Sequence, residues 1–183
     1  MTIHRYILAA CLVAVPASLA ASVISIGSNN ARMCYQAADS NRAPRADDFD
    51  RCTLALAGAP TREDLIATYV NRGLLFLRRG VIDAATADFD RALEIDPGQP
   101  EALLNKGAIA IRQEDMSSAL RYFSAALEHR TRRPHLAYYG RAVAYEEMGN
   151  IPQAYADYVR ATEAAPNWGP PRQDLRRFRV AGR

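Results

Sequence analysis

The cysteines are the residues of this sequence best suited to chemistry, because two thiols can form a covalent bond. The chain has three of them, Cys11, Cys34 and Cys52. Cys11 lies in an apolar N-terminal segment that is expected to be removed on export, which leaves an even number. An even count in an exported chain favours a disulfide. We therefore expect Cys34 to bond to Cys52; two free, buried thiols are the alternative.

Local structure has to bring these two cysteines together. Residues 31–40 and 47–57 each have a helical pattern, and Asn-Arg-Ala-Pro at 41–44 forms a polar break between them. Proline disfavours helix in the residue before it and cannot donate a backbone hydrogen bond. The sequence thus predicts a short antiparallel helical hairpin, which the disulfide would hold closed.

Side chains for metal binding or catalysis are scarce. His129 and His135 flank a loop that carries three arginines, at 130, 132 and 133, whose charges would repel a cation. No Gly-x-Ser-x-Gly, glycine-rich phosphate loop or His-Glu-x-x-His is present. We therefore predict no catalytic residue, no metal site and no cofactor, and a protein that is not an enzyme.

Two pairs of carboxylates are separated by a single phenylalanine. They are Asp48 with Asp50, and Asp88 with Asp90. Residues two apart on a helix point away from each other, so neither pair can share a proton or an ion. We interpret all four as surface charges.

The N-terminal segment resembles a secretory signal. Residues 6–31 carry no charge, Arg5 precedes an apolar run at 7–15, and small residues follow up to Ala21. A positive start, a short apolar core and small residues are typical of a cleaved signal peptide. We expect cleavage after Ala20 and a periplasmic or secreted protein. The alternative is an uncleaved membrane anchor, although the apolar run is shorter than the roughly 20 residues that a spanning helix needs.

The rest of the chain is dominated by a repeat of about 34 residues. Asn71-Arg72-Gly73 aligns with Asn105-Lys106-Gly107, and then with Gly140-Arg141-Ala142. The same registration aligns alanines and aromatic residues further along: Ala85, Ala119 and Ala154; Phe89, Phe123 and Tyr158; Ala92, Ala126 and Ala161. A repeat of this length is typical of stacked helical arrays, whose units bury their apolar faces against one another.

Each unit has the pattern of two helices joined by a tight turn. We expect Thr61 with Asp64 to cap the first helix and Gly80 to end it in a left-handed conformation. In the last unit Gly149 should end one helix, and Asn150 should cap the next. The small residues Gly73, Gly107 and Ala142 should leave a notch on the first helix, where the second helix approaches through its alanines and aromatic residues such as Phe89 fill the space around the contact.

These residues resemble the tetratricopeptide repeat, which has a small residue on its first helix, Ala-aromatic-Ala on its second and a terminal proline. The resemblance covers about 103 of the 183 residues, with Ala110, Thr131 and the turn at Glu114 departing from the pattern. It implies an all-α, right-handed superhelical array of three helix-turn-helix repeats. The expected organisation is: signal peptide 1–20; helical hairpin 21–60; repeat region 61–168, with units 66–99, 100–134 and 135–168; capping helix and basic tail 169–183, the helix covering 172–180.

The resemblance also implies a partner-binding surface, because first helices of this family line a concave groove. Carried over by position, that groove presents Val70, Asn71, Leu74, Arg78, Leu104, Asn105, Ala108, Arg112, Tyr139, Val143 and Glu146. Asn71 and Asn105 are the polar candidates, either for holding a peptide backbone or for bonding neighbouring helices. Only Asn105 matches the family's clamp for chaperone C-terminal tails, so binding by that mode is disfavoured.

Charge does not indicate a nucleic-acid partner. The net charge is +3, and five arginines against one aspartate fall in residues 172–183 without interleaved aromatic residues beyond Phe178. We expect an exported interaction module, a scaffold or adaptor, that binds a peptide or helix of another protein. Contact with a membrane is expected only if the N-terminal segment is retained. The alternatives are a membrane-tethered scaffold and a non-catalytic accessory subunit of a cell-envelope enzyme.

Overall fold

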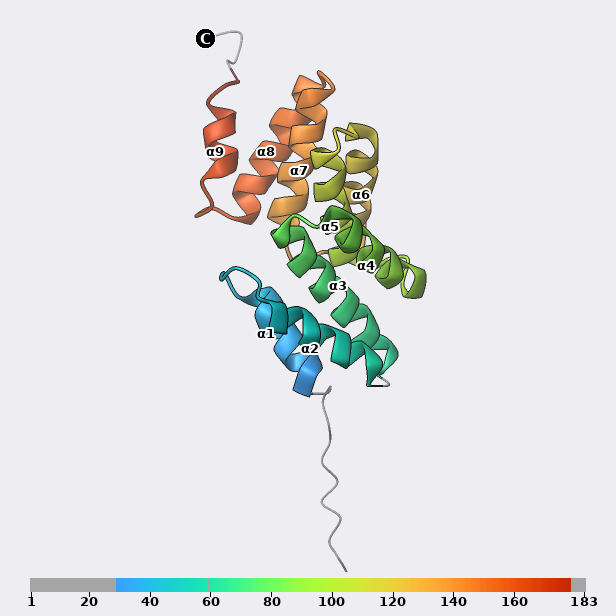
Figure 1. The fold of residues 1–183 in the computed structure, drawn as a ribbon. Coiled ribbons are helices and arrows are strands. Elements are labelled where there is room, and N and C mark those ends of the chain that lie inside the picture. The colour runs from blue at the N-terminus through green and yellow to red at the C-terminus, as the bar shows by residue number, and fades with distance from the viewer. Residues whose placement is uncertain (1–28, 59, 179–183) are drawn as a thin grey trace, which may run out of the picture.

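The computed structural model describes residues 29–58 and 60–178, and in this part of the chain all regular structure is helical. The predicted all-α class is therefore confirmed (Figure 1). The helices are α1 (Asn29–Asp39), α2 (Ala46–Ala57), α3 (Arg62–Arg79), α4 (Ile82–Ile95), α5 (Pro100–Arg112), α6 (Met116–Glu128), α7 (Pro134–Glu147), α8 (Ile151–Ala164) and α9 (Pro170–Leu175). The predicted signal peptide and its cleavage point lie outside the described residues.

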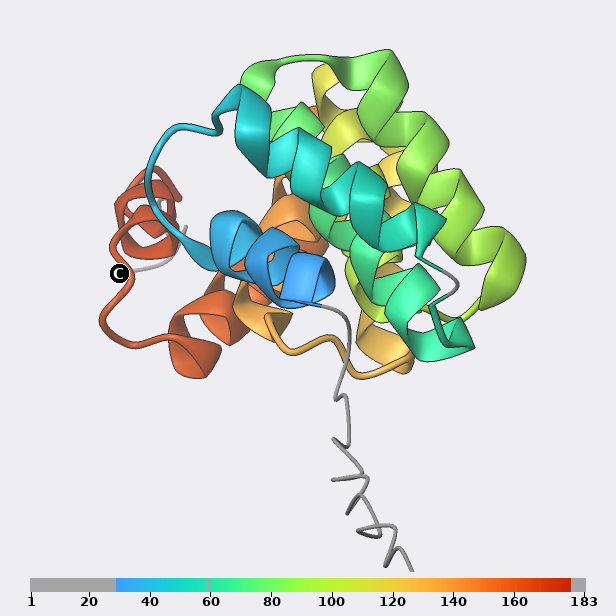
Figure 2. The ribbon, with the colours of Figure 1, turned by 60° about the horizontal axis from the view of Figure 1, so that its bottom comes forward.

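Six of these helices form the predicted right-handed superhelical array. The pairs α3–α4, α5–α6 and α7–α8 each pack together, and α4 contacts α5 just as α6 contacts α7. Each pair therefore covers an apolar face of the next, as an open solenoid requires. The hairpin α1–α2 stands at one end of the array against α3, and α9 stands at the other end against α8 (Figures 1 and 2).

Local sequence explains where the helices begin and end. The Thr61 hydroxyl accepts a hydrogen bond from the backbone N–H of Asp64 at 3.1 Å, and Gly80 ends α3 with φ of 78°, both as predicted. Gly149 takes φ of 75° after α7. The capping role predicted for Asn150 is wrong: it occupies the N-cap position of α8, but its side chain makes no capping hydrogen bond.

The close approach at the predicted notch is confirmed in the first two units, but the group that faces the glycine is the aromatic ring of the second helix and not its alanine. A Cβ atom added to Gly73 would lie 2.7 Å from Phe89 Cε1, and one added to Gly107 would lie 2.7 Å from Phe123 Cε1. In the third unit Ala142 shares a buried cluster with Tyr158. A close approach of backbone to ring is possible only where the facing residue is small.

The C-terminal capping helix differs from the predicted span of 172–180. It begins at Pro170, because a proline in the first turn of a helix needs no amide partner and already has a helical φ. It ends at Leu175, and the Phe178 N–H then donates to the Leu175 carbonyl in a tighter turn. This turn brings the Phe178 ring to within 5.7 Å of the Tyr158 ring, so that the aromatic side chain covers the last unit.

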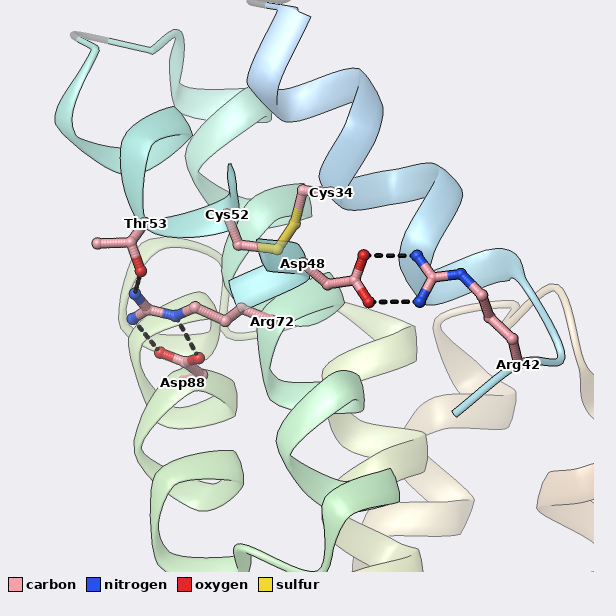
Figure 3. Close-up of a disulfide and its surroundings, with 7 residues drawn as sticks. All are labelled: Cys34, Arg42, Asp48, Cys52, Thr53, Arg72 and Asp88. Atoms are coloured by element: carbon pink, nitrogen blue, oxygen red, sulfur yellow. Dashed lines mark hydrogen bonds and ion pairs between the residues drawn. A yellow bond between two sulfur atoms is a disulfide. The ribbon is translucent and has the colours of Figure 1, made fainter. Parts of the chain in front are cut away.

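The N-terminal hairpin has the predicted helices, and the two cysteine sulfurs lie within disulfide distance. The Cα atoms of Cys34 and Cys52 are 4.9 Å apart, and both residues are fully buried (Figure 3). They form one cluster with Leu75 of α3. The Phe49 ring also lies 4.7 Å from the Phe76 ring, so the hairpin is anchored on the first unit by apolar contacts.

Candidate protein-interaction surface

The residues predicted to line the groove all lie on the first helices of the units. Val70, Asn71, Leu74 and Arg78 are on α3; Leu104, Asn105, Ala108 and Arg112 are on α5; Tyr139, Val143 and Glu146 are on α7. The helical spacing thus places each set on its expected element. Their surroundings differ, however, and these surroundings decide which side chains a partner can reach.

Three of the predicted residues are buried. Val70 is 8% exposed, Leu104 is 4% exposed and Asn105 is 7% exposed. The Asn105 side-chain amide donates to the Glu101 carbonyl of its own helix at 2.8 Å. These residues therefore pack or brace the array, while Asn71 on α3 is half-buried.

At one end the hairpin occupies the predicted surface. Leu74 packs against the cluster that contains the two cysteines. The Arg78 guanidinium donates to the Ala38 carbonyl at 3.2 Å and also to the Arg42 carbonyl, while Arg79 donates to Pro44 at 3.0 Å. Of the two arginines predicted for the groove, Arg78 thus holds the hairpin on α3, together with Arg79, which was not predicted.

At the other end the residues around α9 occupy the surface. The Tyr139 hydroxyl donates to the Asp174 carboxylate at 2.8 Å, and burial together with this hydrogen bond raises the pKa of Tyr139 to about 12. Glu146 accepts from the Tyr158 hydroxyl at 2.7 Å and from Arg177 at 2.8 Å. Both polar groups predicted for partner binding on α7 therefore tie the C-terminal segment to the array.

The middle of the predicted surface is left open. Ala108 and Val143 are partly exposed, and Arg112 is exposed. Beside them a pocket of about 450 Å³ lies between the α5–α6 turn and α7, lined by Ile111, Glu114, Met116, Val143 and Glu147. Of the predicted residues, only Val143 lines this pocket. Sequence reasoning missed Ile111, Met116 and the two glutamates because they surround the turn that departs from the family pattern.

The four aspartates interpreted as surface charges have different environments. Asp88 is 4% exposed and accepts two hydrogen bonds from Arg72, at 2.7 and 2.8 Å (Figure 3). Asp48 is 3% exposed and pairs with Arg42, while Asp90 pairs with Lys106. The surface-charge interpretation is wrong for Asp48 and Asp88, because a carboxylate two residues from an exposed one lies on the buried side of the helix.

One cation on the first helix of each unit joins two second helices. Arg72 binds Asp88 of α4 and donates to Thr53 of α2 at 3.1 Å (Figure 3). Arg141 binds Asp157 of α8 at 2.6 Å and Ser124 of α6 at 3.1 Å. Each cation therefore reaches the second helix of its own unit and the second helix of the preceding element.

The middle unit keeps this arrangement with different chemistry. Tyr122 stands where Asp88 and Asp157 stand in the other units, and the Lys106 amino group lies 5.3 Å from the centre of its ring. Lys106 also pairs with Asp90 of the preceding unit. A cation is attracted to the face of an aromatic ring, so Tyr122 replaces the carboxylate. The cation before each notch and the residue before each aromatic were visible signals in the repeat.

Within the described residues nothing adds a metal or membrane site. No group of three or more histidine, cysteine or acidic side chains there could hold a metal ion. His135 contacts the Trp168 ring at 5.3 Å, and burial, then the charge of Arg133, lowers its pKa. In the same part of the chain none of the helices has the length and apolar character to cross a bilayer.

The fold and its surfaces define a helical-repeat protein of the kind that presents stacked helices to other proteins. The family model described as Tetratricopeptide repeat matches residues 70–134 and again 104–167. The chain therefore belongs to the tetratricopeptide repeat family, whose members are typically non-catalytic interaction modules.

Solved structures show the same fold at low sequence identity. PilW, titled a widely conserved type IV pilus biogenesis factor, is 22% identical, with a TM-score of 0.67 over 82% of this chain and 69% of its own. The first repeat domain of Spaghetti (RPAP3), bound to the HSP90 peptide SRMEEVD, is 22% identical. Its TM-score is 0.57, over 61% of this chain and 88% of its own.

Two curated relatives match part of the chain. A protein SGT1 homolog of Oryza sativa subsp. japonica is 35% identical over 86 residues, which are 45% of this chain and 22% of that protein. Cellulose synthase 2 operon protein C of Komagataeibacter xylinus is 37% identical over 57 residues, 31% of this chain and 4% of that protein. The chain thus spans less than a quarter of either relative.

Proposed function

We propose that this chain is an exported scaffold or adaptor whose array holds a peptide or helix of another protein. The observation that carries the proposal is the open middle of the predicted surface. There Ala108, Arg112 and Val143 remain accessible, while the hairpin and the α9 segment occupy the two ends. The apolar side chains of this open surface supply affinity when a partner buries them, and its charged side chain orients the partner.

The narrowed surface changes the expected role of the predicted residues. Asn71, Ala108, Arg112 and Val143 are proposed to contact the partner. Leu74, Arg78, Tyr139 and Glu146 are proposed to shape the site indirectly, because they hold the chain's own flanks in place. A short site of this kind supports an affinity on the order of micromolar.

Export to an oxidising compartment belongs to the same proposal. The signal-like segment motivates it, and a disulfide between Cys34 and Cys52 forms and persists in such a compartment. PilW is by its title a type IV pilus biogenesis factor, and the Komagataeibacter xylinus relative is by name a protein of a cellulose synthase operon. Intact-mass measurement on protein from the producing cells tests export: a chain beginning at Ala21 supports it, and a retained Met1 contradicts cleavage.

Crosslinking in the producing cells tests capture. A photo-reactive residue at Ala108 should capture a defined protein partner, because it lies in the open part of the surface. The matched control carries the same residue at Arg121, which is exposed on α6. Capture at both positions, or at Arg121 alone, would contradict binding by the array's first helices.

A further inference from the structure

We propose that the pocket between the α5–α6 turn and α7 takes a partner segment in which an apolar side chain stands next to a lysine or arginine. This inference rests on the proposed function and specifies the chemistry of the partner. Of the two arginines predicted for the groove, Arg78 is engaged with hairpin carbonyls and is not free to pair with an acidic partner.

Three apolar side chains line the pocket. Ile111, Met116 and Val143 line a space of about 450 Å³, large enough for a leucine, isoleucine or methionine side chain. A partner side chain that covers these three residues removes their apolar surface from water.

Two carboxylates form the charged rim of the pocket. Glu114 and Glu147 line the same pocket, both are exposed, and neither has an ion pair or side-chain hydrogen bond within the described residues. Arg112, two residues before Glu114, does not line the pocket and makes no ion pair with Glu114 within the described residues, so both charged residues of the lining are negative. A cationic side chain meets complementary charge there and an acidic one meets repulsion.

A second pocket on the array differs from this one in the pairing of its charged side chains. It lies between α7 and α8, measures about 350 Å³ and is lined by charged residues including Arg141, Asp157 and Arg160. These charges pair with one another, because Asp157 accepts from both arginines. Two arginines against one aspartate leave a net positive charge there, but each of these side chains already has an ion-pair partner, whereas Glu114 and Glu147 have none within the described residues.

Peptide selection followed by titration tests the inference. The full-length protein is used to select from a phage-displayed library of random 12-residue peptides, and the most enriched peptide is made with a fluorescein label. We expect enriched peptides to place lysine or arginine beside leucine, isoleucine or methionine. Affinity by fluorescence anisotropy should fall about tenfold in the Glu114→Gln/Glu147→Gln double variant, since each exposed ion pair contributes modestly.

The control is a matched double variant, Glu128→Gln/Glu163→Gln, which removes two exposed glutamates elsewhere on the array and should leave affinity unchanged. Higher salt should weaken binding of the selected peptide to the natural chain more than to the Glu114/Glu147 variant. Matched circular dichroism melts of the two variants establish that the substitutions leave the fold intact.

Other outcomes overturn the inference. Enrichment of acidic peptides, no enrichment, or equal affinity for the natural chain and the Glu114/Glu147 variant each contradicts a cationic occupant. A dimer in sedimentation velocity that this variant dissociates makes a second copy the occupant. The proposed function fails separately, when crosslinking at Ala108 in cells captures no protein.

Discussion

In the hairpin, the contact between the two helices is made by a pair of cysteines. In the first two repeat units, the corresponding contact is made by a glycine and a phenylalanine ring. On α2 the buried residues Asp48, Cys52 and Ala55 follow a spacing of four and three. On α4 the buried apolar residues Ala85, Phe89 and Ala92 follow the same spacing. Cys52 thus stands in the place of Phe89.

The difference follows from how much apolar surface each region can bury. The hairpin helices have 11 and 12 residues and pack on one neighbour, α3. The middle unit has helices of 13 residues and is covered on both sides. Where neighbours are few, a covalent bond stabilises the pair by restricting the unfolded chain. Where neighbours are many, ring packing suffices.

The largest expected effect is loss of the disulfide. Cys34→Ala/Cys52→Ala should lower the free energy of unfolding by about 3 kcal/mol, because the bond closes a loop across 18 positions. Urea unfolding followed by circular dichroism measures it. Reductant should destabilise the natural chain and leave the double variant unaffected. If reductant leaves the free energy of unfolding of the natural chain unchanged, the disulfide is not formed in solution.

The next effect tests the ring contact that replaces the disulfide. Phe123 lies between Gly107 and Gly140, and a Cβ atom at Gly107 would lie 2.7 Å from its ring. Alanine has a higher helix propensity than glycine. Gly107→Ala should nevertheless lower the free energy of unfolding by about 2 kcal/mol, because the Phe123 ring is held between two helices and cannot move away from the added methyl group. Thermal unfolding measures this change.

Gly169→Ala serves as the control for that variant, because nothing lies within 4 Å of the added atom. Its effect should stay within about 0.5 kcal/mol. If Gly107→Ala is as stable as the natural chain, the array tolerates a wider helix separation and the notch does not set its packing.

A smaller effect separates two aspartates that lie one residue either side of Phe89. Asp88→Ala should cost about 2 kcal/mol, because it leaves the Arg72 guanidinium without its buried partner. Asp90→Ala should cost about 0.5 kcal/mol, since the Asp90 side chain is 47% exposed. Paired chemical unfolding curves give the comparison, and equal costs would contradict the assigned burial.

The smallest effect is acid sensitivity of the hairpin. The hydrogen bond from Arg42 holds the pKa of Asp48 below its ordinary value of 3.8. The unfolded chain therefore takes up this proton first, so the stabilisation is complete above pH 3.8 and is lost as pH falls through the folded pKa. Asp48→Asn should reduce that acid loss by less than about 1 kcal/mol, because Arg42 is solvent-exposed.

Unfolding measured from pH 5 to pH 2 checks this, with exposed Asp47→Asn as the control. The acid limb should become shallower in Asp48→Asn alone. An identical acid limb in both variants would mean that the Arg42 contact does not persist in solution.

Sequence reasoning predicted those features that repeat. The helix pairs, the notch at Gly73 and Gly107, and the caps at Thr61 and Gly80 each follow from local spacing and backbone chemistry, and the structure bears them out. Periodicity also put the candidate groove residues on the first helices, because a helical face is fixed by its spacing.

It could not predict which of those residues stay accessible. Arg78 and Glu146 are held by the hairpin and by the α9 segment, elements outside the repeat whose docking depends on long-range contacts. The burial of Asp88 was missed for a related reason. A charged residue is normally exposed, and the buried Asp88 carboxylate is stabilised by its partner Arg72, which lies sixteen residues earlier in the sequence.

The cationic side chains of the array also determine how cooperatively the protein unfolds. Arg72, Lys106 and Arg141 each link a second helix to the one before it, through Thr53, Asp90 and Ser124. In a one-dimensional array, contacts between neighbours set how far unfolding of one unit spreads. These links place part of the energy at the junctions, so hairpin and units should unfold in one cooperative transition, with coincident calorimetric and spectroscopic curves.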